Sequence, residues 1–235
     1  RHPVGALEST ADGKFTRVFR IGTATGAFVV DPESRSTSSR SLRLRIHSDD
    51  PKVLFEVSRR VRKMFDLDSD PLRIESHFGD FPLLDRLVRA RPGLRLPRGF
   101  DGFETGVSTI LGQLVSSKRA SVLLSTLIEN YGEEIPHPLD PGTKVRLFPT
   151  PERLSDAGLD ELGTTGLRKE TIRSFSRSVA SGKIHFSEAQ DPESFKRRLR
   201  SIPGIGPWSA ECLSFRTIGD PDAFPSTDLI LRRAN

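Results

Sequence analysis

The segment Ile202-Pro203-Gly204-Ile205-Gly206-Pro207-Trp208-Ser209-Ala210 is the most informative in this chain of 235 residues. One helical pattern ends near Arg200, two glycines follow two positions apart, and a second helical pattern begins near Trp208. Glycine permits positive φ and lets another backbone approach closely. Amides at the start of the second helix, beside its positive dipole end, form an anion site. The segment therefore predicts a helical hairpin that binds a backbone phosphate without reading a base. An ordinary helix–turn–helix connection with capping glycines is the alternative.

Asp228 ends the segment Phe224-Pro225-Ser226-Thr227-Asp228, which follows the hairpin segment in the chain. The apolar run 229–231 comes directly after it, so Asp228 is expected at a helix start, where the helix dipole keeps a carboxylate ionised. A fixed carboxylate of this kind can stabilise positive charge that develops on a reacting group. A plain N-cap aspartate is the structural alternative.

The composition is basic, with 36 Lys and Arg against 31 Asp and Glu, a net charge of +5 and a pI of about 9.7. This balance is compatible with a nucleic-acid partner. The single cysteine, Cys212, cannot form an internal disulfide, and by itself it cannot build a zinc or iron–sulfur site. No apolar run approaches the roughly 20 residues of a membrane span, and no signal peptide is visible.

The N-terminal third alternates between strand and turn patterns. Apolar runs in residues 15–30 surround Gly22 and Gly26, which predicts a hairpin. Residues 31–41 read as a polar, serine-rich loop, and residues 42–46 alternate leucine or isoleucine with arginine as a half-buried strand does. These patterns predict an antiparallel sheet.

Helical patterns dominate from Pro51 onward. Apolar residues recur at helical spacing over 53–65, and the Pro- and Gly-bearing stretch 92–99 reads as a linker. Beyond it, Thr150 and Asp191 each precede a proline suited to the first helical position. The overall prediction is an α+β fold, in which a helix packs on the sheet and an all-α region follows.

Two domains are expected, 1–91 and 92–235. The chain begins with Arg1 rather than Met and stops at Asn235 inside a helical pattern, so it is expected to be part of a longer polypeptide, with the second domain truncated at its C-terminus.

The hairpin segment followed by Asp228 closely resembles the signature of the helix-hairpin-helix/GPD DNA glycosylases, and the wider chain resembles their AlkA-type 3-methyladenine DNA glycosylase II subfamily. The further matching segments are Phe65-Asp66-Leu67-Asp68, Arg91-Pro92-Gly93-Leu94-Arg95, Phe100-Asp101-Gly102-Phe103-Glu104, Ile110-Leu111-Gly112-Gln113-Leu114-Val115-Ser116 and Gly219-Asp220-Pro221-Asp222-Ala223-Phe224. The resemblance implies an N-terminal sheet domain like the TATA-binding protein fold, then a helix-hairpin-helix glycosylase domain.

The same resemblance implies a role for each site residue. Asp228 would be catalytic, and Trp208 and Cys212 would line the base pocket, with Cys212 where some relatives carry a tyrosine. Leu114 would be the wedge that fills the gap left by a flipped base. The other implied DNA-binding residues are Gln113, Gly204, Ile205, Gly206 and Ser209. The backbone carbonyls of Arg200, Ile202 and Ile205 would hold a structural monovalent cation.

The implied activity is monofunctional hydrolysis of the N-glycosidic bond of alkylated bases, of the 3-methyladenine and 7-methylguanine type, in base-excision repair. The partner would be double-stranded DNA, bound by a monomer without a required cofactor or nucleotide, in the bacterial cytoplasm at the nucleoid or in a eukaryotic nucleus. Trp208 stands where strand-cleaving relatives carry a lysine nucleophile, which argues against a Schiff base. Two alternatives stay open: a non-catalytic hairpin module that only binds DNA, and a bifunctional glycosylase for oxidised bases.

Overall fold

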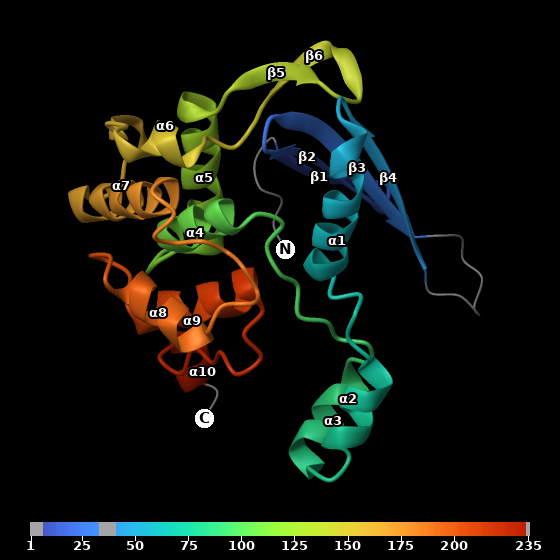
Figure 1. Cartoon of the computed structure of the whole chain (residues 1–235). Helices are drawn as coiled ribbons and strands as arrows, with labels where there is room; N and C mark the ends of the chain where they lie inside the picture. Colours follow the sequence, from blue (N-terminus) through green and yellow to red (C-terminus); the bar gives the residue numbers. More distant parts are fainter. Residues whose placement is uncertain (1–6, 33–40, 234–235) are drawn as a thin grey trace.

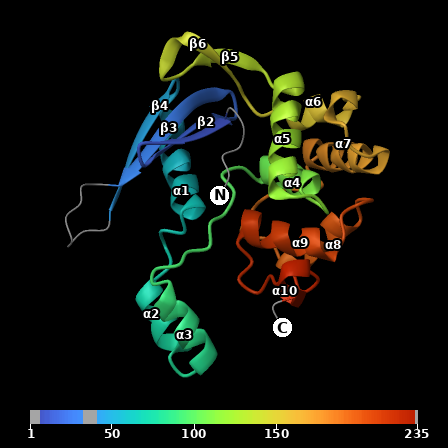
Figure 2. The same cartoon turned by 180° about the vertical axis from the view of Figure 1, so that it is seen from behind.

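The computed structural model describes residues 7–32 and 41–233 (Figure 1). Most of the predicted serine-rich loop, at 33–40, and the chain end at Asn235 lie outside these ranges. An antiparallel sheet with one helix on it lies beside a larger group of helices, and both views show a separate pair of helices, α2 and α3, below them (Figures 1 and 2). Within the described ranges, no helix is both long and apolar enough to cross a membrane.

The sheet has the strand order β1-β2-β3-β4, with every neighbour antiparallel, as predicted. Its strands are β1 (Glu8–Ala11), β2 (Lys14–Ile21), β3 (Ala24–Pro32) and β4 (Leu42–Ser48). Gly22 lies in the β2–β3 turn with a φ of +60°. Gly26, expected near this turn, is instead inside β3 opposite Phe19, where a Cβ would lie 2.7 Å from the Phe19 ring. The missing side chain there makes room for the aromatic core.

One face of the sheet is covered by α1 (Leu54–Met64), which follows the short 3-10 helix Pro51–Val53. Val57 and Val61 of α1 are buried against Phe28 of β3, in one apolar cluster. The expected helix over 53–65 is therefore confirmed, and the period of its apolar residues explains why it lies on the sheet.

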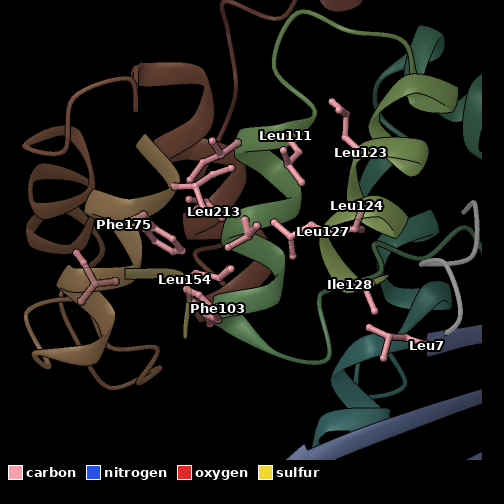
Figure 3. Packing of buried hydrophobic residues seen from close by; sticks show 14 of the residues in the cluster. Leu7, Phe103, Leu111, Leu123, Leu124, Leu127, Ile128, Leu154, Phe175 and Leu213 are labelled. Carbon is pink, nitrogen blue, oxygen red and sulfur yellow. The ribbon is translucent and has the colours of Figure 1, made fainter. Parts of the chain in front are cut away.

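The remaining helices form the second part of the molecule, with a core that surrounds α4 (Figure 3). Phe103 and Phe175 stack with ring centroids 5.8 Å apart, and Leu111 and Leu127 are fully buried in the same cluster. The helices are α4 (Gly102–Leu111), α5 (Ser117–Tyr131), α6 (Pro151–Ser155), the 3-10 helix Asp160–Leu162, α7 (Gly166–Ala180), α8 (Pro192–Arg200), α9 (Pro207–Leu213), the π-helix Ser214–Ile218 and α10 (Leu229–Arg233). Thr150 and Asp191 cap α6 and α8 as expected.

Two features were not predicted. Strands β5 (Glu134–His137) and β6 (Asp140–Arg146) form a hairpin inside the region expected to be all helical, and buried Val145 ties it to the helical core. Prolines in this stretch obscure its strand pattern. Helices α2 (Pro71–Phe78) and α3 (Pro82–Ala90) form the separate pair.

The sheet and the helices are held together by a buried ion triad. Arg17 of β2 donates to both Glu8 of β1 and Glu104 of α4, and all three residues are buried. Leu7, Val18 and Ala27 from the sheet side belong to the same apolar cluster as the helices. The expected division at residue 91 stays a prediction, since the two parts share this core.

Candidate active site

The hairpin forms where it was predicted. Helix α8 ends at Arg200 and α9 begins at Pro207. Ile202 and Ile205 are buried and fix the turn to the helical core. Gly204 has a φ of +88°, and a Cβ there would lie 2.0 Å from Thr171 Oγ1 on α7. Only glycine fits this position, because both its backbone conformation and its surroundings exclude a side chain.

The second glycine has a different role from the expected one. Gly206 has a φ of −89° with ψ near 180°, which is ordinary extended backbone, and a Cβ there would meet nothing within 4 Å. It is the N-cap of α9, followed by Pro207 and then by Trp208 and Ser209 in the first turn. The first amides of a helix lack acceptors within the helix. The open space beside Gly206 thus lies next to amides suited to an anion.

Asp228 lies immediately before α10 and is bound on both carboxylate oxygens. Oδ2 accepts a hydrogen bond of 2.8 Å from Trp208 Nε1. Oδ1 accepts from the amides of Ile230 (2.8 Å) and Leu231 (3.3 Å). The bond from Trp208 and then those from the two amides hold the pKa of Asp228 below its ordinary value. Asp228 is therefore an anion at neutral pH, oriented by three donors.

Trp208 and Cys212 lie one helical turn apart on α9, and both are half-buried. The indole therefore has a defined orientation, since its Nε1 is bonded to Asp228. Burial raises the pKa of the Cys212 thiol to about 11, and the negative charge of Asp228 adds to that effect. Cys212 is a neutral, compact group at neutral pH.

Leu114 is at the tip of the loop 112–116, called the wedge loop here, between α4 and α5. Its side chain is 93% exposed, although the preceding Leu111 is fully buried. Its φ of +54° lies in the left-handed region, which is strained for leucine. A large apolar side chain held outward by a strained backbone is not a core residue, which agrees with the predicted wedge.

Gln113 connects the wedge loop to the hairpin. Its side-chain amide donates to the carbonyl oxygen of Gly204 (3.0 Å) and to Ser209 Oγ (2.8 Å). Ser209 is 2% exposed, so its side chain does not reach the surface, and its expected contribution to DNA binding is limited to its backbone amide. The role of Gln113 in this structure is to hold the wedge loop against the hairpin, because its side-chain amide is bonded to Gly204 and Ser209.

The three residues expected to hold a monovalent cation lie at the end of α8 and in the turn that follows it. Ile205 donates its amide to the carbonyl oxygen of Ile202 (3.1 Å), which closes the turn. The buried side chains of Ile202 and Ile205 point into the core and leave their backbone in the turn. A carbonyl oxygen has two lone pairs, so Ile202 can still take part in such a site. The cation itself and the roles of Arg200 and Ile205 in binding it stay predictions.

Several supporting residues were missed at the sequence level. Arg168 of α7 donates to the carbonyl oxygen of Gln113 (2.6 Å) and to Thr164 Oγ1 (2.8 Å), which braces the wedge loop. Lys196, Asp220 and Glu211 form an ion network beside the loop that carries Asp228. Asp220 lies in the family-matching segment 219–224, but the sequence pattern does not reveal the pairing of these residues.

Comparisons with known proteins show the family to which the chain belongs. A family model described as the AlkA N-terminal domain matches residues 1–101. "DNA-3-methyladenine glycosylase 2" of Escherichia coli is 30% identical over 233 residues, which cover 98% of this chain and 78% of that protein. The chain belongs to the AlkA family of DNA-3-methyladenine glycosylases. The predicted family and the predicted α+β fold are confirmed.

A second AlkA relative is much longer than the chain. The Mycobacterium tuberculosis protein named "Probable bifunctional transcriptional activator/DNA repair enzyme AlkA" is 33% identical over 231 residues, which cover 98% of this chain but 45% of that protein. The chain thus spans less than half the length of this relative.

Solved structures share the fold. A 3-methyladenine DNA-glycosylase from Archaeoglobus fulgidus superimposes with a TM-score of 0.81 at 22% identity, covering 98% of this chain and 77% of its own. A Clostridium acetobutylicum 8-oxoguanine glycosylase/lyase bound to double-stranded DNA has a TM-score of 0.68 at 18% identity, with coverages of 97% and 84%. Because alkylation and oxidation glycosylases both match, the fold alone does not determine the damaged base.

Proposed function

We propose that the chain is the catalytic part of a monofunctional DNA glycosylase that hydrolyses the N-glycosidic bond of alkylated bases in double-stranded DNA. The observation that carries the proposal is the carboxylate of Asp228, which is ionised and oriented by Trp208 Nε1 and two backbone amides. The names of the relatives support the same activity.

Asp228 would act on the sugar rather than on the base. As the bond to the base breaks, positive charge develops on the sugar, and a fixed anion beside it lowers the barrier. Oδ2 accepts only the bond from Trp208, so it keeps a lone pair with which it can orient a water molecule. The charge is already in place before the reaction, so no side chain needs to reorganise.

Alkylated bases suit a site of this kind. Methylation of a ring nitrogen gives the base a positive charge and makes it a better leaving group, so a strong general acid is unnecessary. The indole face of Trp208 can attract such an electron-poor ring. Cys212, smaller than an aromatic residue and neutral, would leave the pocket wider on its side.

DNA would be held through its backbone and opened by the wedge loop. Amides beside Gly206 would bind a phosphate on any sequence. Leu114, exposed at the loop tip, would occupy the space that the flipped base vacates. Gln113 couples the two actions, since it binds Gly204 and Ser209.

One copy of the chain supplies all these groups, so a monomer is sufficient. Hydrolysis of an activated bond by water needs no cofactor, and a cation at the hairpin turn would be structural.

The test is base release from synthetic duplexes that carry one 3-methyladenine, 7-methylguanine, hypoxanthine or 8-oxoguanine. We expect release of alkylated bases, with strand breaks that appear only after alkali treatment. Breaks without alkali, together with a borohydride-trapped DNA adduct, would instead identify a bifunctional enzyme. Duplex binding without release of any base would support the non-catalytic module, in which Asp228 only caps α10.

A further inference from the structure

The segment 219–228, called the Asp228 loop here, has little regular structure, yet it must hold a carboxylate in place. It begins after the π-helix Ser214–Ile218, where Gly219 adopts a φ of +76°. π-helical turns occur frequently at functional sites. Near its end, Asp228 donates its amide to the Pro225 carbonyl oxygen (2.8 Å). Arg232 of α10 donates to the Ser226 carbonyl oxygen (3.3 Å), and side chains of α8, α9 and the π-helix also contact the loop.

Asp220 anchors the start of the Asp228 loop. It is 4% exposed and accepts hydrogen bonds from Ser214 Oγ (2.8 Å) and from the Asp222 amide (3.1 Å). Lys196 Nζ lies 3.3 Å from its Oδ2. Burial would raise the pKa of Asp220, but these bonds and the lysine charge outweigh it and lower the pKa, so the anchor is a carboxylate.

Glu211 of α9 anchors the middle of the loop. Its Oε2 accepts the amide of Phe224 at 3.2 Å, and Lys196 Nζ lies 3.4 Å from the same oxygen. A single ammonium group therefore binds the carboxylates at both anchor points. Lys196 itself projects from α8, is 9% exposed, and has a third partner in Glu193 at 2.6 Å.

Such a buried network is sensitive to the loss of one member. Without the lysine, Asp220 and Glu211 would be two buried or half-buried like charges that have lost the ammonium group they share, and both would gain by moving toward water. The Asp228 loop is attached to both, so its path would change. A displacement of about 1 Å at a catalytic group can reduce a rate by about a hundredfold.

We propose that Lys196 is a positioning residue for Asp228, which it fixes by binding Asp220 and Glu211 at the two anchors of the loop. The inference rests on the proposed function, because it gives the network a role in base excision. Lys196 does not itself touch the reacting atoms. Its effect must pass through the loop to the Trp208–Asp228 pair.

Trp208 provides a readout that is independent of DNA. It is the only tryptophan in the chain, and its Nε1 is bonded to Asp228. If the Asp228 loop shifts, the indole exchanges a fixed carboxylate for water, and its fluorescence emission moves to longer wavelength. A purely structural loss of stability, with the native site intact, would leave this emission unchanged under native conditions.

The experiment compares Lys196→Met, Lys196→Arg and Asp220→Asn with the wild type. The control is Lys144→Met, which removes a lysine from an ion pair with Glu134 in the distant β5–β6 hairpin. Each protein is measured for thermal unfolding, affinity for undamaged duplex, single-turnover base release and Trp208 emission. Asp220→Asn keeps an oxygen that accepts the bond from Ser214. It therefore tests the same network if Lys196→Met fails to fold.

We expect Lys196→Met and Asp220→Asn to lose about tenfold to a hundredfold in release rate, with affinity for undamaged DNA within about twofold. Their Trp208 emission should shift to longer wavelength, Lys196→Arg should recover part of the rate, and Lys144→Met should match the wild type. Wild-type rates and emission in both variants, or losses of rate and affinity in equal proportion, would overturn the inference. If the wild type releases no base, the proposed function fails. The Trp208 emission of the variants then still tests whether Lys196 positions the Asp228 loop.

Discussion

Trp208 Nε1 donates to Asp228 Oδ2 across 2.8 Å, although the two residues are twenty positions apart in the chain. The residue whose ring face could hold the damaged base therefore also orients the carboxylate that would act on its sugar. This bond is the largest contribution to the low pKa of Asp228. In the proposed mechanism this bond couples recognition to catalysis, and mutation of Trp208 can separate the two.

Replacement of Trp208 by Phe keeps an aromatic face and removes the N–H donor. The pKa of Asp228 should then rise toward its ordinary value, since the bond from Trp208 is the main cause that lowers it. The anionic form is present only above this pKa, so the acidic limb of the release rate should move to higher pH in the variant. Single-turnover rates across the acidic range measure this. An acidic limb at the same pH in both proteins would show that the bond does not control the ionisation on which release depends.

The two hairpin glycines should respond differently to substitution. Gly204→Val should destabilise the fold, because of its positive φ and the 2.0 Å contact with Thr171. Gly206→Val has open space and should fold with near wild-type stability, but its side chain would occupy the place where a phosphate approaches. We expect weaker binding of Gly206→Val to damaged and undamaged duplex alike.

Thermal unfolding and binding to both duplexes check this pair. A Gly206→Val protein that folds and binds undamaged duplex as tightly as the wild type would remove the hairpin from the DNA interface.

Leu114 should contribute to excision and little to stability. Leu114→Ala should raise the activation barrier for base release from duplex by about 1–3 kcal/mol. It should hardly change release from single strands, because only a duplex has a gap to fill after base flipping. The free energy of unfolding of Leu114→Gly should exceed that of Leu114→Ala by about 1 kcal/mol, because glycine adopts the φ of +54° without strain. Equal losses of rate on duplex and single strand would refute the wedge.

Local sequence patterns were sufficient for the parts of the site that depend on nearest neighbours. The hairpin, the helix that begins after Asp228 and the sheet strands all follow from residue order, capping and periodicity. The exposure of Leu114 could be named only through family resemblance, since an isolated leucine in an apolar stretch predicts core.

Tertiary contacts decided the rest. Gly206 could not be distinguished from Gly204 before Thr171 was seen to fill the space beside only one of them. The sequence alone assigned no role to Lys196 or Asp220, because their pairing depends on how α8 meets the Asp228 loop. No pattern within either segment indicates it.

The most direct test of the account is single-turnover base release by Asp228→Asn, with binding to the same duplex measured in parallel. Asparagine is almost isosteric and can still accept from the Ile230 and Leu231 amides, so folding and the helix cap should survive. Loss of the negative charge should raise the barrier by roughly 3 kcal/mol, about a hundredfold in rate, with neutral hypoxanthine affected more than 3-methyladenine. Affinity should be unchanged or tighter, because a carboxylate repels phosphates. Near wild-type release of both bases by a folded Asp228→Asn protein would contradict the catalytic role and leave Asp228 as a helix cap.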